Sequence, residues 1–582
     1  MEKIVFKKTL FDTIEKMEKY KYSSKPLLKN YIKQFFVVFL SNIVTLLLLT
    51  IDGLVVSLFV GEDALNSVNL LNPVVLIGGA ITVVPAQGVG FVLSKTFGIG
   101  SESEIKKTLR ASMLLAVVFL IAKPLIQLPI TYVMINSYFV SAEIKQLMNL
   151  YAIGIIISEA VSVINTIGTY ILIASGRVND LFKLSILECS LNLVLDLLFV
   201  PVLNMGVLGA GLATAISCTA RGIVTMVIIA KEFNIFSIER IPCKDKIKDI
   251  LNNGISKGLF LLTSALSKYI ITMMFTKFVG IEAITVISVC GIASSLAQMI
   301  ATSFIQSGSV VIGLFAGSDD WEVASDIAQK IRFFCIFGVS LFVIGTIVFI
   351  KVLFSTYGIN EYTVFQLLSA RLYMFSCIPF GYLLFLQDMC AYCDKKKEST
   401  VVSVLNGLLI IPIMYIFQYL NKNLVFLCYG IDYIISVIIL SIVVYKEMNK
   451  RIIKSKYSNR IHLTFTEKDA IDVSQKLNNF LVKNNAPKRI AYRIALICEE
   501  LGSYAKNKVN DIDTHIFLSI CMSNELMTVL YLDDSEPAIM NKKLTATNLI
   551  LGNYNLIESV ASEFTYQCIS GMNNFIIKIA ID

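Results

Sequence analysis

The chain has 582 residues, of which 55% are apolar and only 16% are charged, and its mean hydropathy is +0.71. A soluble chain carries about 25% charged residues, so this composition excludes a soluble enzyme, a disordered chain and a collagen-like chain. The net charge of +8 is small for the length and gives no indication of nucleic-acid binding, and the twelve Cys form neither a disulfide framework nor paired metal-binding couplets. The sequence therefore predicts a membrane protein.

Twelve runs of mainly apolar residues are long enough to cross a hydrocarbon core, which takes roughly 20 residues. They lie at 33–59, 66–94, 109–134, 149–174, 182–203, 207–230, 254–279, 284–315, 333–355, 364–392, 399–420 and 423–445. The first 30 residues hold eight Lys and lack the apolar run of a signal peptide. We therefore expect about twelve retained spans, which is a polytopic α-helical fold.

The loops between these runs alternate in their content of Lys and Arg, which sets the orientation of a membrane protein. Basic residues gather in the loops that follow spans two, four, six and ten; they are Lys95, Lys106, Lys107, Arg110, Arg177, Lys183, Lys231, Arg240, Lys244, Lys246, Lys248, Lys395, Lys396 and Lys397. The even-numbered loops and both termini are therefore expected in the cytoplasm. The predicted location is the cell membrane.

The spans divide into two halves of six that resemble each other. The segment 59–64 (FVGEDA) after span one matches 278–283 (FVGIEA) after span seven, and Leu191-Asn192 in span five matches Leu405-Asn406 in span eleven. Internal repeats of this kind are common in secondary transporters, whose substrate site lies between the repeats. A duplicated structural bundle without transport would show the same pattern.

The region after Tyr445 differs, because it carries regular charge and no spanning run. We predict two amphipathic helices over 470–501, strands at 515–522 and 526–533, a helix near 550–561, and strands near 563–569 and 573–581. This is a small two-layer α/β domain. The predicted organisation is a basic N-terminus (1–30), a first lobe (31–232), a cytoplasmic linker (233–252), a second lobe (253–447), a linker (448–461) and the C-terminal domain (462–582).

Acidic residues inside spans are costly and usually functional. Asp52 lies deep in span one, and Asn192 and Asp196 are one turn apart on the same face of span five. Two carboxylates beside an amide and a hydroxyl suit either a monovalent cation or a shared proton; the structural alternative is that each acid braces a kinked helix. The matching positions of the second half are Ile271 and Ile410, so this chemistry is expected in the first lobe alone.

Other ionisable residues within the spans have three interpretations: internal ion pairs, the lining of a wet cavity, or misplaced helix ends. They are Glu159, Glu188, Arg221, Lys268 and Asp388, of which Glu188, Lys268 and Asp388 are the candidates for cavity charges. Asp432, near the start of span twelve, is expected at the membrane interface.

Several motifs of residues 25–450 together resemble the MATE (multidrug and toxic compound extrusion) family. The first span carries the segment 51–65 (IDGLVVSLFVGEDAL). Further matches follow in the family's order: Asn72-Pro73, 94–98 (SKTFG), 174–177 (ASGR), Leu191-Asn192 through Asp196, and 206–214 (GVLGAGLAT). The resemblance implies two six-helix lobes around a V-shaped cavity, and export of organic cations against inward Na⁺ or H⁺.

The resemblance also implies a coupling site. In prokaryotic relatives it is built from an Asp in span one, an Asn and an Asp in span five and a Thr in span six, which correspond here to Asp52, Asn192, Asp196 and Thr214. Another branch of the family uses an acid in span seven, where this chain has Thr263, Ser264 and Lys268 instead. That departure favours coupling in the first lobe.

The C-terminal region resembles the anti-sigma-factor branch of the histidine-kinase-like ATPases, in degenerate form. The segment 491–501 (AYRIALICEEL) resembles the helix of that fold with its catalytic Glu, here Glu500, but Tyr504 stands where the family has a metal-binding Asn. The remaining nucleotide-binding remnants are Asp534 of the adenine-reading turn and Gly552 of the phosphate lid. The lost residues predict no ATPase or kinase activity, and no ATP or Mg²⁺ is expected as a cofactor.

The leading interpretation is a cation-coupled (Na⁺ or H⁺) antiporter that exports drug-like or metabolite substrates and carries a cytoplasmic regulatory domain. One alternative is a membrane-anchored regulator whose tail binds a sigma-type or anti-anti-sigma-type protein partner. Another is a flippase for a lipid-linked or peptide substrate. All three expect contact with membrane lipids and none expects nucleic acid.

Overall fold

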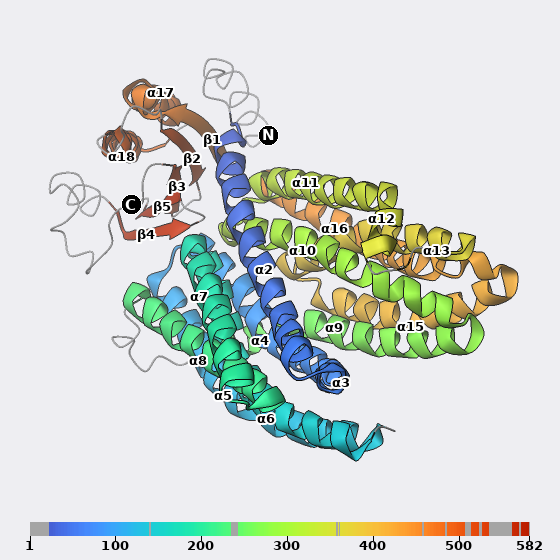
Figure 1. The fold of residues 1–582 in the computed structure, drawn as a ribbon. Helices are drawn as coiled ribbons and strands as arrows, with labels where there is room; N and C mark the ends of the chain where they lie inside the picture. Colours follow the sequence, from blue (N-terminus) through green and yellow to red (C-terminus); the bar gives the residue numbers. More distant parts are fainter. Residues whose placement is uncertain are drawn as a thin grey trace.

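The computed structural model describes residues 22–138, 141–233, 243–356, 359, 361–456, 459–483, 486–506, 514–522, 526–534, 561–569 and 572–580. Within these residues twelve helical segments are long and apolar enough to cross a membrane, which confirms the predicted number of spans. Figure 1 shows the helices in two groups, with a small sheet and two further helices at one end of the bundle. We call this the sheet end, and the opposite end the far end.

The first lobe contains α2 (Lys25–Phe59), α3 (Glu62–Leu70), α4 (Asn72–Ile99), α5 (Glu102–Ser137), α6 (Ala142–Ala174), α7 (Val178–Leu197), a π-helical segment (Leu198–Val202) and α8 (Gly206–Phe233). The second contains α9 (Lys244–Phe278), α10 (Ile281–Gly317), α11 (Trp321–Val348), α12 (Ile350–Thr356), α13 (Val364–Phe375), α14 (Cys377–Tyr392), α15 (Lys396–Leu420) and α16 (Leu427–Lys456). Each lobe thus supplies six spans.

The two halves share a backbone feature at the turn after their first span. Gly61 and Gly280 have φ angles of +118° and +109°, a region that L side chains rarely adopt and that Gly adopts freely. The N–H of Gly61 binds the carbonyl of Val56, and the N–H of Gly280 binds the carbonyl of Phe275. The repeated FVG motif therefore forms the same helix end in both halves.

The C-terminal region forms an antiparallel sheet of order β1-β2-β3-β5-β4. Its strands are β1 (Asn459–Thr466), β2 (His515–Met522), β3 (Leu526–Asp533), β4 (Glu563–Ile569) and β5 (Met572–Ala580), and its helices are α17 (Ala470–Lys483) and α18 (Lys488–Lys506). The predicted helices over 470–501 and the four predicted strands are confirmed to within a few residues. The predicted helix near 550–561 lies almost wholly outside the described residues.

Some predicted boundaries differ from the structure because helices continue past the apolar runs. α16 extends to Lys456 and β1 begins at Asn459, so the expected linker 448–461 is mostly helix and strand. Likewise α9 already begins at Lys244, within the expected linker 233–252, and α2 begins at Lys25, within the expected N-terminal segment 1–30. These helix ends carry charged residues, so hydropathy does not identify them as parts of the helices.

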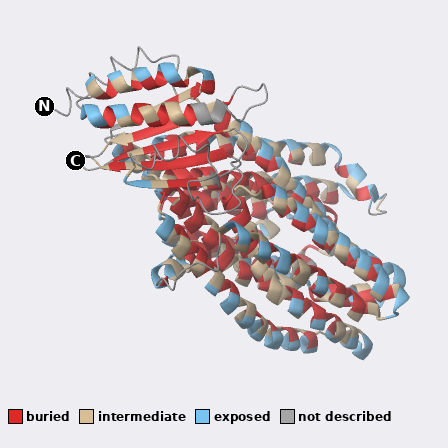
Figure 2. Ribbon diagram, turned by 90° about the vertical axis from the view of Figure 1, so that its left-hand side faces the viewer, coloured by how far each residue is buried: buried red, intermediate tan, exposed pale blue. Residues whose placement is uncertain are grey.

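The sheet is buried on both faces. Ile461, Leu463 and Phe465 of β1 belong to the core shared with α17 and α18, while Phe517 of β2 and Ile576 of β5 belong to the core of the helical bundle. Successive side chains of a strand point to opposite faces, so one sheet serves two cores. Figure 2 shows the buried strands between the two outer helices and the bundle.

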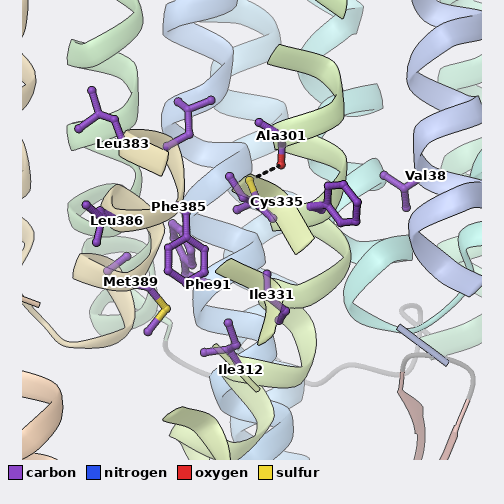
Figure 3. Packing of buried hydrophobic residues seen from close by; sticks show 14 of the residues in the cluster. Val38, Phe91, Ala301, Ile312, Ile331, Cys335, Leu383, Phe385, Leu386 and Met389 are labelled. Atoms are coloured by element: carbon purple, nitrogen blue, oxygen red, sulfur yellow. Dashed lines mark hydrogen bonds between the residues drawn. The ribbon is translucent and has the colours of Figure 1, made fainter. Parts of the chain in front are cut away.

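The two lobes contact each other closely at the sheet end. A Cβ added to Gly98 of α4 would lie 1.9 Å from the carbonyl oxygen of Leu314 of α10, and one added to Gly317 would lie 2.0 Å from the carbonyl oxygen of Lys95. Figure 3 shows the hydrophobic core that the lobes share, in which Phe91 of α4 lies beside Phe385 of α14. The sheet end is therefore closed by backbone contact between α4 and α10.

Gly98→Ala should destabilise this closed contact, because the added methyl overlaps a backbone carbonyl that belongs to the opposite lobe. Overpacking of this kind costs about 1–3 kcal/mol, so we expect a lower midpoint of thermal unfolding in detergent. Gly79→Ala in the same helix is the matched control, since its Cβ would meet nothing within 4 Å. Equal unfolding midpoints for the two variants would contradict the close contact.

Candidate functional site

Asp52, Asn192, Asp196 and Thr214 lie together in the first lobe, and we call them the coupling cluster. They come from α2, α7 and α8, in the parts of these helices nearer the far end. Asp196 stands at the end of α7, directly before the π-helical segment that contains Pro201. π-helical turns are rare and often occur at functional sites.

Three of the four side chains are buried and Thr214 is half-buried, and hydrogen bonds link Thr214 to Asp52 and to Asn192. Asn192 and Asp196 are 0% exposed and Asp52 is 5% exposed. The hydroxyl of Thr214 donates to Asp52 Oδ2 at 2.7 Å, and Asn192 Nδ2 donates to Thr214 Oγ1 at 3.4 Å. The structure therefore brings together all four residues that the sequence singled out.

Several oxygen atoms of the coupling cluster have no hydrogen-bond partner among the described residues. They are Asp52 Oδ1, Asn192 Oδ1 and both carboxylate oxygens of Asp196, although the two carboxyl groups interact with each other. Buried polar atoms are nearly always satisfied, and two neighbouring carboxylates repel unless a proton or cation lies between them. The donor set of carboxylate, amide and hydroxyl oxygens fits either occupant.

Two further residues lie near the coupling cluster, of which Glu188 was expected as a cavity charge and Tyr151 was not singled out by the sequence. Tyr151 of α6 is 5% exposed and interacts electrostatically with Asp52 and Asp196. Glu188, about two turns before Asp196 on α7, also acts on Asp52. Nothing in the local sequence distinguishes Tyr151 from the other aromatic residues of the spans, so only the packing of α6 against α8 identifies it.

The second lobe differs at the matching positions, as expected. Ile271 and Ile410 are 0% and 4% exposed and belong to the hydrophobic core. In α9, the hydroxyl of Thr263 donates to the carbonyl of Ser403, Ser264 is half-buried and Lys268 is exposed. Span seven therefore presents no acid at these three positions.

Three other acidic residues of the spans form internal ion pairs. Glu159 pairs with Lys123 at 2.6 Å, and Glu188 pairs with Arg221 at 2.5 Å. Asp388 pairs with Lys257 at 3.2 Å and accepts from Gln87 of the first lobe at 3.2 Å. Glu188 and Asp388, expected as cavity charges, are thus buried and neutralised by a partner.

Asp432, expected at the membrane interface from its place in the sequence, has a side chain that is buried inside the second lobe. Its side chain is 1% exposed, and Asn406 Nδ2 donates to its Oδ2 at 2.9 Å. Asp432 is close to the start of α16 and faces α15 inside the lobe.

The C-terminal sheet contacts both lobes at the sheet end. On the first lobe, the hydroxyl of Thr565 donates to the carbonyl of Gly100 at 2.6 Å, and Ile576 packs against Gly100. On the second lobe, Arg460 donates to the carbonyl of Ser318 at 2.7 Å. Since Gly100 follows α4 and Ser318 follows α10, the sheet bridges the two helices that close this end.

Asp320 is the central polar residue of this docking contact. Its side chain is 0% exposed, and its Oδ2 lies 2.8 Å from His462 Nε2 and 3.5 Å from Arg460, while the hydroxyl of Ser519 donates to it at 3.0 Å. Burial alone would raise the pKa of Asp320, but His462 and Arg460 outweigh it and hold that pKa below its ordinary value. Asp320 also caps α11, since its Oδ1 accepts from the N–H of Val323.

Of the three nucleotide-binding remnants, the structure describes Asp534 and Glu500. Asp534 Oδ1 accepts from the backbone N–H of His515 at 2.7 Å, so this carboxylate binds the first residue of the interior strand β2. Glu500 is half-buried in α18, and Gly552 lies outside the described residues. In the described part of the chain no group of three or more His, Cys, Asp and Glu side chains is placed to hold a metal ion.

Comparison with known proteins agrees with this architecture. The MatE family model matches residues 38–198, while no curated protein matches the chain. A MATE crystal structure in a bent conformation is similar at 18% identity and a TM-score of 0.68, covering 74% of this chain and 97% of that one. An outward-facing multidrug resistance MATE transporter of the MOP superfamily has 18% identity and a TM-score of 0.64, with 74% and 96% covered.

A third solved structure is a MOP superfamily transporter from Pyrococcus furiosus, whose binding pocket is described as having reverse polarity that suggests a different function. It has 18% identity and a TM-score of 0.64, and covers 75% of this chain and 100% of that one. The helical part of the chain is therefore a multi-pass membrane protein with the fold of MATE transporters, and most of its first lobe matches the MatE family model.

Proposed function

We propose that this protein is a cation-coupled antiporter that exports organic, drug-like or metabolite molecules across the cell membrane. The observation that carries the proposal is the coupling cluster with its unpartnered buried oxygens. A static bundle gains nothing from two adjacent uncompensated carboxyl groups, because burying them is unfavourable. A transporter uses them, since occupation by an ion changes which conformation is more stable.

The coupling ion is Na⁺ or H⁺, and it is a transported substrate rather than a resident cofactor. Thr214 and Asn192 orient the carboxyl of Asp52, while Asp196 supplies the second negative charge. Ion entry would remove the repulsion between the carboxyls and shift the first lobe toward a second arrangement. Differential affinity for the two arrangements is all that coupling requires.

The C-terminal domain is proposed to regulate this cycle from the cytoplasm. Alternating access requires the closed end to open, and the sheet contacts Gly100 of one lobe and Ser318 of the other. While docked on both, it opposes the separation of α4 and α10. A ligand or cytoplasmic protein that binds the domain and weakens docking would therefore speed opening.

The test is transport by the purified full-length chain in liposomes, with a panel of organic cations and neutral or anionic analogues. Na⁺ and pH gradients are imposed separately, without a membrane potential and then with one. We expect substrate movement driven by at least one gradient and none after the gradient is collapsed. A correctly folded protein that moves no substrate of any charge under either gradient would contradict the proposal and favour a regulator or flippase.

A further inference from the structure

The second lobe contains a buried carboxyl group that has no charged partner among the described residues. Asp432 of α16 is 1% exposed, and around it lie Asn406 of α15 at 4% and Ser436, one turn further along α16, at 1%. Asn406 Nδ2 donates to Asp432 Oδ2 at 2.9 Å and to Ser436 Oγ at 3.3 Å. Asp432 Oδ1 has no hydrogen-bond partner in the described part of the chain.

This second-lobe cluster (Asn406, Asp432 and Ser436) occupies a place related to that of the coupling cluster. Asn406 is the counterpart of Asn192 in the internal repeat. In the first lobe the Asn of α7 donates to Thr214 of α8, and in the second lobe the Asn of α15 donates to Asp432 of α16. The fifth and sixth spans of each lobe thus hold a polar cluster, but the acids are at different positions in the two lobes.

The groups around Asp432 are neutral. The titratable neighbours in this region are Cys428 and Tyr433 of α16, Tyr373 of α13 and Cys377 of α14. Among the described residues no charged side chain of α11, α13, α14 or α15 acts on Asp432, in contrast to the paired Glu159, Glu188 and Asp388. An ionised carboxylate here would be buried without compensation, which is strongly unfavourable.

We propose that Asp432 is a proton-binding site of the second lobe, separate from the coupling cluster. The proton neutralises the carboxyl where the fold supplies no cation. A metal ion does not fit, because Asn406 directs its N–H donors at both neighbouring oxygens and a hard cation needs several oxygen ligands. If the protein is the antiporter proposed above, this site gives the second lobe its own dependence on protons.

Infrared spectroscopy of the purified protein tests proton occupancy without any transported substrate. The background is the double variant Asp52→Asn/Asp196→Asn, in which Asp432 is the remaining buried carboxyl of the described spans that lacks a charged partner. We expect this background to show the carbonyl stretch of a protonated carboxylic acid at neutral pH. The band should shift in D₂O, shift again in Ser436→Ala, and disappear in Asp432→Asn.

Three outcomes would overturn the proposal: no such band in the background, a band that survives Asp432→Asn, or a band that Na⁺ removes at constant pH. Asp432→Asn replaces a neutral acid with a neutral amide of the same shape, so folding should persist; gel filtration checks this. A wild type that transports nothing would contradict the antiporter but leave the infrared result standing, so the two failures are distinguishable.

In liposomes Asp432→Asn should slow pH-gradient-driven transport by about tenfold, within the usual range of coupling between sites. Asp432→Glu, which keeps the carboxyl, should retain more of the rate. Unchanged pH-driven transport in Asp432→Asn would show that the bound proton takes no part in the cycle and would contradict a role in coupling.

Discussion

Asp52→Asn and Asp196→Asn should each reduce gradient-driven transport in liposomes by about 100-fold, near the upper end of measured couplings between sites. Each substitution keeps the size of the side chain but removes one of the two charges that would bind the ion. With one carboxyl left, the repulsion that ion binding relieves is gone, so the gradient no longer biases the conformational equilibrium. The initial rate of substrate uptake under a Na⁺ or pH gradient measures this.

The matched control is Asp63→Asn, which removes a carboxylate from an exposed position on the neighbouring α3. We expect it to transport at the wild-type rate. Substrate binding without a gradient should persist in Asp52→Asn and Asp196→Asn, because the change is in coupling. Wild-type gradient dependence in either variant would mean that its carboxyl braces a helix and does not bind the coupling ion.

Thr214→Val should have a smaller effect of the same kind. It removes the hydroxyl that donates to Asp52 Oδ2 at 2.7 Å, so the carboxyl loses its orientation but keeps its charge. A hydrogen bond to a charged group is worth about 1.5–3 kcal/mol, and we expect a raised ion concentration for half-maximal transport with a nearly unchanged maximal rate. Thr219→Val in the same helix, whose hydroxyl binds only the backbone of Ala215 in the described structure, is the control.

Much of the membrane region follows from the sequence because hydropathy, helix length and charge bias are local properties. The two acids of the coupling cluster were predictable because acids are rare inside spans, so Asp52 and Asp196 were prominent before their proximity was known. Thr214 was named only through the resemblance to the MATE family. Tyr151 was not, because its role depends on the packing of α6 against neighbouring helices. The burial of Asp432 was missed because sequence position reports depth along a helix and not which side of it faces the lobe.

In the C-terminal region, too, local features were predictable from the sequence and long-range contacts were not. Alternating apolar residues predicted β2 and β3 at their observed limits, and the same alternation at Ile461, Leu463 and Phe465 would have identified β1. Docking was not predictable, because Asp320 and His462 are 142 positions apart and neither neighbourhood contains a motif. An acid directly before a helix is predicted to be its N-cap, and Asp320 does cap α11. The local sequence does not indicate that Asp320 also binds the C-terminal sheet.

Asp320→Asn should weaken docking of the sheet and speed opening of the sheet end. The amide still caps α11, since Asn is as good an N-cap as Asp, but the charge that attracts His462 and Arg460 is lost. Breaking a buried charged pair costs about 3–5 kcal/mol, which corresponds to at least about 100-fold in the docking equilibrium. We expect faster hydrogen exchange in 95–100, 314–320 and 459–466, and a higher transport rate if opening limits the cycle.

Acidification of the wild type, like the substitution Asp320→Asn, should weaken docking of the sheet. The pKa of Asp320 is lower in the docked state than its ordinary value of about 3.9. Docking therefore gains stability above the ordinary pKa and loses it as the pH falls through the lowered value, where the docked carboxylate becomes protonated. In Asp320→Asn this part of the pH dependence of exchange should be absent.

Glu322→Gln is the matched control for Asp320→Asn, because it removes a charge from the exposed first turn of the same helix. Its exchange and transport should equal those of the wild type.

If Asp320→Asn exchanged faster but transported more slowly, the docked sheet would be needed for the cycle rather than restraining it, and regulation by release would be wrong. Unchanged exchange in 459–466 would instead show that apolar contacts of Phe517 and Ile576 hold the sheet without Asp320. Asp320→Asn thus distinguishes the contribution of the polar contacts to docking from that of the apolar contacts, because the substitution alters only the charge.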